Sequence, residues 1–219
     1  MAEAGVQFKE HHYAHHFHSA EHEFRTAKKG MWVFLLQEVL FFSPLFVGYL
    51  VFRALYFKDF HIAAEELDWF MGAVNTLVLI TSSLTAARAI SNAQKGNRDG
   101  VIENIIFTIV CGCGFLIIKY LEYAHKFHVG TLPGKWFHNP ELLAQAPHAP
   151  LFFTFYFLMT GLHGLHVLVG ICVFIWLLIR ARRNEFGPDY YTPLELTGLY
   201  WHFVDIVWIY LFPLLYLVG

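Results

Sequence analysis

Long apolar runs alternate with short polar segments along most of the chain. The runs cover about residues 31–57, 69–87, 101–124, 150–179 and 196–218. A helix needs about 20 mostly apolar residues to cross a bilayer, and a backbone in lipid must pair all its polar groups internally. The short alternating segments of a membrane β-barrel are absent from the pattern. The sequence therefore predicts an all-α, polytopic membrane bundle with five transmembrane helices.

The polar segments divide the chain into two predicted parts. Residues 1–29 form a His-rich tail, and residues 30–219 form a single transmembrane bundle. The first 30 residues contain no apolar core of a signal peptide, so no cleavable leader is expected. Imidazoles bind divalent metals, but the tail histidines have the spacing of no defined site. The segment 125–149 holds three prolines and is predicted to be an ordered loop outside the membrane.

Basic residues gather in alternate polar segments, which orients the bundle. Ten of the 15 basic residues fall on one predicted side: Lys9, Arg25, Lys28, Lys29, Arg88, Lys95, Arg98, Arg180, Arg182 and Arg183. The first loop on the opposite side is acidic, with Asp59, Glu65, Glu66 and Asp68. Because positive charge stays on the cytoplasmic side, the N-terminus is predicted to be cytoplasmic and the C-terminus extracytoplasmic.

Composition supports a membrane protein and narrows the candidate chemistry. The chain is 57% hydrophobic and 15% charged, whereas a soluble domain has roughly 25% charged residues. No nucleic-acid signature is present. The three cysteines lie in apolar runs, which implies no disulfide framework. Cys111 and Cys113 are two residues apart in a predicted helix, so they point in different directions and form a poor metal chelate.

Ionisable residues inside the apolar runs are the candidate functional groups, because charge in the membrane interior is costly. They are Glu38, Lys119, Glu122, His163, His166, His202 and Asp205. Glu38 has no basic partner within one turn, so it is either protonated or paired to another helix. Lys119 and Glu122 are three apart near the predicted outer end of their helix. We expect them to form an ion pair there, with the lysine reaching towards the interface.

The histidines leave two interpretations open. His163 and His166 share one helix face, and His202 shares another with Asp205. His163 and His202 lie at similar predicted depths, as a bis-histidine haem would require. Alternatively, the polar groups bond across a close contact between the fourth and fifth predicted helices, with Gly161 and Gly164 permitting the close approach.

Four segments together resemble subunit III of the haem–copper respiratory oxidases. They are MWVFLLQEVLFF around Glu38, NTLVLITSSLTAARA over 75–89, FYFLMTGLHGLHVLVG over 155–170 and YWHFVDIVWIYLF over 200–212. The resemblance covers nearly all of the chain from Gly30 onward and is that of a short bacterial form with five helices. Lys119 departs from the family, which more often has glutamine at this position.

The resemblance implies a non-catalytic subunit of a proton-pumping complex that reduces O₂ to water. It implies no catalytic residue, metal or cofactor in this chain, because the haem and copper centres belong to partner subunits I and II. It further implies lipid binding, support of proton uptake, and a bacterial inner-membrane location. Small subunits or a respiratory supercomplex are further candidate partners. Glu38 matches the family glutamate associated with the lipid cleft and with a proposed oxygen route, and it is the candidate for a proton-related role.

Three alternatives remain open at this stage. The electron donor is expected to be cytochrome c, but the motifs equally suit a quinol oxidase. A membrane electron carrier would use His163 and His202 to hold a b-type haem. A proton-coupled transporter would use Glu38 and Asp205, but it predicts inverted repeats or broken helices, and the sequence shows neither.

Overall fold

The computed structural model describes residues 8–9, 13–15 and 17–217. Five helices in the described residues are long and apolar enough to cross a membrane, which confirms the predicted all-α fold. They are α1 (Ala20–Leu55), α3 (Trp69–Gln94), α4 (Arg98–Val129), α6 (Ala149–Arg182) and α7 (Thr192–Phe212), the last continuing as the π turn η2 (Pro213–Leu217). Three short elements connect them: α2 (Phe57–Glu65), η1 (Gly134–Trp136) and α5 (Pro140–Gln145).

Polar caps set the starts of α1, α3 and α4, and two of these helices, α1 and α4, begin before the predicted apolar runs. α1 begins at Ala20 rather than at residue 31, since the Ser19 side chain accepts a hydrogen bond from the His22 amide at 3.1 Å. The end of the predicted tail is therefore helical. Asp68 and Asn97 cap α3 and α4 in the same way. A capping side chain satisfies backbone N–H groups that have no partner within the helix, so the starts of α1 and α4 follow the caps rather than the hydropathy.

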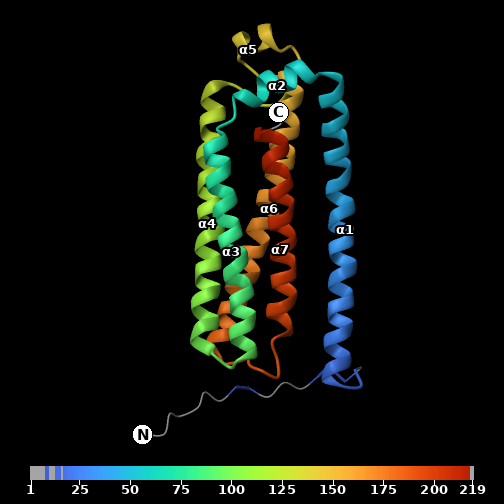
Figure 1. Ribbon diagram of the computed structural model, residues 1–219, viewed down its shortest axis with the longest axis vertical. Helices are drawn as coiled ribbons and strands as arrows, with labels where there is room; N and C mark the ends of the chain where they lie inside the picture. The colour runs from blue at the N-terminus through green and yellow to red at the C-terminus, as the bar shows by residue number, and fades with distance from the viewer. Residues whose placement is uncertain (1–7, 10–12, 16, 218–219) are drawn as a thin grey trace.

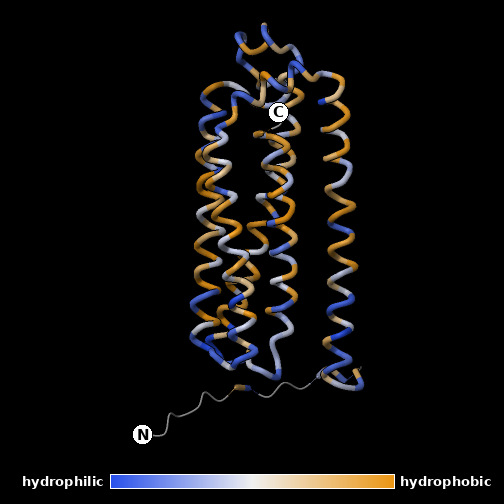
Figure 2. The backbone as a smooth tube through the Cα atoms, in the orientation of Figure 1, coloured by the Kyte–Doolittle hydropathy of each residue, from blue (hydrophilic) through white to orange (hydrophobic). Residues whose placement is uncertain are grey.

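Four helices form the main bundle, and the fifth lies beside it. α3, α4, α6 and α7 are grouped together, whereas α1 stands to one side of α7 and α6 (Figure 1). Apolar residues dominate the middle of each helix, and hydrophilic residues gather at both ends (Figure 2). This distribution fits a bundle whose middle lies in hydrocarbon.

Three polar contacts attach α1 to the main bundle at different heights. Lys28 pairs with Glu195 at 2.5 Å near the start of α7. Glu38 contacts His166 of α6 further along α1. The Tyr49 hydroxyl donates to the carbonyl of Leu214 in η2 at 3.2 Å. α1 therefore depends on the last two helices of the chain for its position.

The two ends of the bundle differ in structure. One end carries the start of α1 and the loops that join α3 to α4 and α6 to α7; we call it the basic end. The other, the α2 end, carries α2, η1 and α5 (Figure 1). The predicted loop 125–149 therefore contains the last turn of α4 as well as η1 and α5. There Asp59 holds both the amide and the ring of His148, at 2.9 and 2.6 Å.

α6 and α7 approach each other closely at Gly170, and not at the glycines that were predicted to permit it. A Cβ on Gly170 would lie 2.6 Å from a ring carbon of Trp201, so α6 and α7 meet there with no room for a side chain. At Gly161 and Gly164 the nearest atoms would be 3.7 and 3.9 Å away, which is ordinary contact. The prediction that Gly161 and Gly164 permit a close approach of the fourth and fifth long helices was wrong, because the atoms nearest to these positions belong to Tyr123 and Leu116 of α4 and leave room for a methyl group.

Candidate functional site

Lys119 and Glu122 lie at the centre of a buried polar cluster near the α2 end. The Lys119 ammonium is 2.9 Å from Glu122 Oε2, and the two residues are 6% and 3% exposed. The expected ion pair is confirmed. The expected reach of the lysine towards the interface is wrong, because its ammonium points into the bundle and bonds to Tyr156 and Tyr216.

Two tyrosines complete this cluster. The hydroxyls of Tyr156 and Tyr216 donate to Glu122 Oε1 at 2.8 and 2.6 Å, and the same hydroxyls accept from Lys119 at 3.0 and 2.9 Å. The ammonium also lies within 6 Å of four aromatic ring centres, those of Tyr123, Tyr156, Trp208 and Tyr216. Such rings attract a cation, so both charges have several partners. Because Tyr216 belongs to η2, the cluster also holds the last turn of the described chain against α4.

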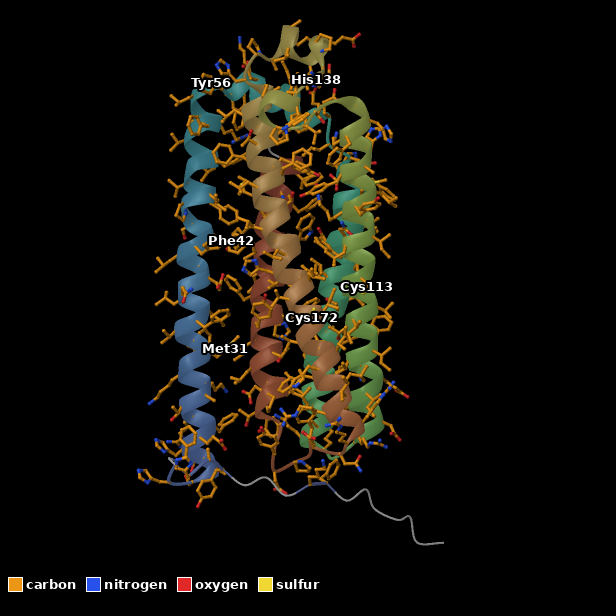
Figure 3. All side chains as sticks on the ribbon, turned by 180° about the vertical axis from the view of Figure 1, so that it is seen from behind. Met31, Phe42, Tyr56, Cys113, His138 and Cys172 are labelled. Carbon is orange, nitrogen blue, oxygen red and sulfur yellow. The ribbon has the colours of Figure 1, made fainter. Side chains whose placement is uncertain are left out.

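Glu38 is paired to a residue of another helix, which is one of the two interpretations that the sequence left open. Its Oε2 atom lies 3.0 Å from Nε2 of His166 in α6. The other ring nitrogen of His166 is 2.7 Å from the carbonyl of Leu162. The ring of Phe42 of α1, labelled in Figure 3 on the side of α1 that faces the bundle, lies beside this imidazole with ring centres 5.1 Å apart and planes tilted by 56°. The contact joins α1 to α6 within the apolar span.

Two side chains of the YWHFVD segment of α7 bond to α3. The His202 ring contacts the Ser83 hydroxyl at 2.5 Å, and the Trp201 indole donates to Ser82 at 2.9 Å. Further along α7, the Trp208 indole donates to Thr76 at 3.0 Å. His202 therefore does not bond to the fourth long helix as predicted, and the polar contact between the fourth and fifth long helices in this segment comes from Tyr200, which donates to the His166 carbonyl. Short hydroxyl side chains of α3 supply the partners, and such residues give no strong signal in a sequence.

His163 and Asp205 are buried without a hydrogen-bond partner among the described residues. The His163 ring lies between the rings of Phe115 and Trp208, at 5.3 and 5.2 Å between centres. The Asp205 carboxylate lies near Ser83, whose hydroxyl contacts His202.

These neighbours do not fit the b-type haem alternative. A haem would need His163 and His202 to face a common space, yet aromatic rings flank the first and a serine holds the second. Within the described residues, no group of three or more His, Cys, Asp or Glu side chains could hold a metal ion. The three cysteines are free thiols, and Figure 3 labels Cys113 and Cys172 on different helices.

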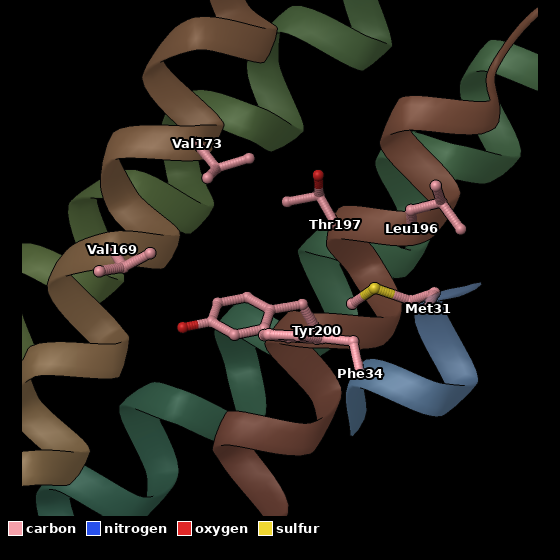
Figure 4. A pocket seen from close by; sticks show the side chains of 7 residues that line it. All are labelled: Met31, Phe34, Val169, Val173, Leu196, Thr197 and Tyr200. Atoms are coloured by element: carbon pink, nitrogen blue, oxygen red, sulfur yellow. The ribbon is translucent and has the colours of Figure 1, made fainter. Parts of the chain in front are cut away.

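An apolar groove of about 230 Å³ opens between α1, α6 and α7. Its lining residues are Met31 and Phe34 of α1, Val169 and Val173 of α6, and Leu196, Thr197 and Tyr200 of α7 (Figure 4). Tyr200 links the groove to the Glu38–His166 contact, because its hydroxyl donates to the backbone carbonyl of His166 at 2.9 Å.

A charged cluster at the basic end was not predicted. Arg180 donates to Glu185 at 2.6 Å, and Lys9 lies 3.5 Å from the same carboxylate. The Lys9 amide also donates to the Asn184 carbonyl at 3.0 Å. The hydrogen bond from Arg180 is the largest cause that lowers the pKa of Glu185. A single sequence offers no signal that residue 9 meets residue 185, since a long interval separates them.

Comparison with known proteins gives one consistent result. The family model described as "Cytochrome c oxidase subunit III" matches residues 147–219. A probable cytochrome c oxidase subunit 3 from Nocardia farcinica is 33% identical, over 86% of this chain and 86% of that protein. A quinol oxidase subunit 3 from Bacillus spizizenii is 30% identical over 87% and 86%. A cytochrome c oxidase subunit 3 from Thermostichus vulcanus is 31% identical over 92% and 91%.

Proposed function

Because the chain belongs to the cytochrome c oxidase subunit III family of haem–copper oxidases, we propose that it is a non-catalytic subunit that stabilises the catalytic subunit. The observation that carries this proposal is the match to oxidase subunits over 86% of both chains. The contacts of the buried charges agree with a supporting role. Lys119, Glu122 and Glu38 bond to side chains of this same bundle.

Phospholipid binding is the second part of the proposal. The groove between α1, α6 and α7 is lined almost entirely by apolar side chains, as Figure 4 shows. An acyl chain is the ligand such a lining suits, because burial of apolar surface drives its binding. Lys28 and Glu195 form an ion pair where α1 meets the start of α7, near Leu196 at the basic end of the groove, and can contact a headgroup.

Membership in the oxidase subunit III family supports a proposal for the partners and the location of this chain. We assign subunits I and II as its neighbours, with the haem and copper centres in those chains and no redox cofactor in this one. Small subunits or a respiratory supercomplex are further partners. The basic end, with Arg88, Lys95 and Arg182, belongs on the cytoplasmic side of a bacterial inner membrane by the positive-inside rule.

Cytochrome c is the proposed electron donor, with quinol as the second candidate. Relatives named cytochrome c oxidase subunit 3 and quinol oxidase subunit 3 have similar identities, 33% and 30%. The donor is decided by oxygen consumption of the purified complex with reduced cytochrome c or with a quinol. We expect turnover with cytochrome c; turnover with quinol alone would assign the second candidate.

The supporting role is tested by comparing the complete oxidase with the oxidase after removal of this chain. We expect the initial rate of O₂ reduction to be largely retained without the chain. We expect the number of turnovers before inactivation to fall, because proton uptake is no longer sustained. Loss of the haem-bearing chains during mild purification of the tagged subunit would contradict the proposal. An immediate and complete loss of the initial rate would instead assign this chain a direct catalytic role.

A further inference from the structure

The His166 imidazole has a defined partner at each ring nitrogen. Nδ1 lies 2.7 Å from the Leu162 carbonyl, one turn earlier in α6. Nε2 lies 3.0 Å from Glu38 Oε2 of α1. The two side chains are 16% and 12% exposed, and Phe41 and Phe42 flank the ring. The imidazole is therefore held in one orientation between two acceptor oxygens.

The Leu162 carbonyl determines where the first proton of this imidazole lies. A carbonyl oxygen can only accept, so Nδ1 must carry hydrogen in this contact. A neutral imidazole then presents a lone pair at Nε2. A lone pair 3.0 Å from an ionised carboxylate is repulsive and forms no hydrogen bond. The observed contact between Nε2 and Glu38 therefore requires one more proton between the two groups.

We propose that Glu38 and His166 form a binding site for a single proton within the membrane span. The bound proton lies either on the carboxyl, which then donates to the neutral imidazole, or on Nε2 of an imidazolium that faces a carboxylate. In both forms the pair has no net charge, which lowers the cost of burying it in an apolar surrounding. The inference rests on the geometry of these contacts and does not require the proposed function.

The groups that face the pair come from all three elements around it. α6 contributes His163 one turn away, and α7 contributes Tyr200, whose hydroxyl donates to the His166 carbonyl. α1 contributes the rings of Phe41 and Phe42. Tyr200 also lines the apolar groove, so the proton site and the groove share one wall.

Loss of the proton has a mechanical consequence for α1. The unprotonated pair carries a net negative charge in an apolar surrounding, and its neutral imidazole can no longer donate to both the Leu162 carbonyl and the Glu38 carboxylate. Glu38→Gln imitates the protonated carboxyl, because its amide N–H donates to Nε2 at every pH. The site therefore predicts a pH-dependent docking of α1 in the wild-type chain and a pH-independent docking in this variant.

The proton is detected directly in the complete oxidase complex with ¹³C-labelled glutamate and ¹⁵N-labelled histidine. Infrared absorption, compared between the wild type and Glu38→Gln, reports whether the Glu38 carboxyl is protonated. ¹⁵N NMR, compared with His166→Gln, reports the charge of the His166 ring. We expect, near neutral pH, either a protonated carboxyl with a neutral ring or a carboxylate with an imidazolium. A carboxylate beside a neutral ring, or protons on both groups, would overturn the proposal.

The docking of α1 is measured with spin labels on Leu36→Cys and the natural Cys172, after Cys111→Ser and Cys113→Ser. All four positions are exposed or half-buried. We expect the distance distribution of the Glu38 chain to broaden as the pH rises until the proton is lost, and that of Glu38→Gln to stay unchanged. Gln37→Leu, on the neighbouring exposed position, is the matched control and should behave as wild type. The same pH response in the wild type and in Glu38→Gln would contradict the proposed site.

Discussion

Lys119 and Glu122 form an ion pair that is enclosed by the bundle, with 2.9 Å between the ammonium and the carboxylate. Two tyrosine hydroxyls bond to both charges. Removing two charges from water is costly, and the pair recovers that cost only with additional hydrogen bonds. The complete cluster is therefore stable, whereas removal of one of its charges leaves the other charge buried without its partner.

Removal of one charge of this pair should destabilise the bundle strongly. Glu122→Leu leaves a buried ammonium without its carboxylate, at a cost of about 3–5 kcal/mol in the free energy of unfolding. Lys119→Met leaves the opposite charge and should cost a similar amount. The double variant should recover most of the loss. A double-mutant cycle on thermal unfolding in detergent measures the coupling; additive losses would show that the two charges are independent.

His163→Phe should be neutral or stabilising. Both ring nitrogens of His163 are buried without a partner among the described residues, and an unpaired buried polar group costs about 1–3 kcal/mol. A phenyl ring keeps the contacts with Phe115 and Trp208. His163→Ala is the control and should cost about 2–5 kcal/mol, because it leaves a cavity. Unfolding temperatures check both variants; a Phe variant as unstable as the Ala variant would indicate an essential polar role.

Gly170→Ala and Gly164→Ala should have opposite effects, although they lie on the same helix. At Gly170 the new methyl would lie 2.6 Å from the Trp201 ring, and such overpacking costs about 1–3 kcal/mol. At Gly164 the nearest atom would be 3.9 Å away, so the helix gains about 0.5–1 kcal/mol from the better helix former. Unfolding of the two single variants in the same detergent makes the comparison. Equal effects would mean that α6 and α7 can separate at Trp201.

Docking of the N-terminal segment should weaken in acid. The hydrogen bond from Arg180, helped by Lys9, holds the pKa of Glu185 below its ordinary value. A lowered folded-state pKa stabilises the contact above the ordinary carboxyl pKa, and this contribution is lost as pH falls through the lowered pKa. The measurement is hydrogen exchange of the Lys9 amide, which donates to Asn184, corrected for the intrinsic pH dependence of exchange. Protection should fall in acid.

Glu185→Gln is the control for that titration. Its protection at Lys9 should be lower near neutral pH, because the charge pairs with Arg180 and Lys9 are gone, and it should show little further change in acid. If the wild type and the variant follow the same acid profile, a group other than Glu185 releases the segment.

The hydrophobic pattern was sufficient to predict the five spans, because a bilayer imposes the length of an apolar helix. The helix ends were missed where a cap such as Ser19 extends the helix into polar sequence. Spacing along one helix correctly paired Lys119 with Glu122. It could not place that pair inside the bundle, since the direction of the lysine depends on Tyr156 and Tyr216, which come from other helices.

The partners of polar residues on other helices could not be predicted from one sequence. Glu38 required a partner on another helix, but only the three-dimensional arrangement identifies His166. His202 was assigned to the wrong neighbour because Gly161 and Gly164 suggested a close contact with the fourth helix. The partner is Ser83, a residue type common in transmembrane helices for many reasons.

The attachment of α1 has a consequence for the order in which the chain matures. α1 is made before α6, α7 and η2, yet its polar partners Glu195, His166 and Leu214 lie in those elements. Chains emerge from the ribosome N-terminus first, and membrane helices associate after they insert. The nascent α1 must therefore wait in the bilayer, with Glu38 unpaired, until nearly the whole chain has been translated. Incomplete chains would present that exposed acidic helix to the machinery of membrane-protein quality control.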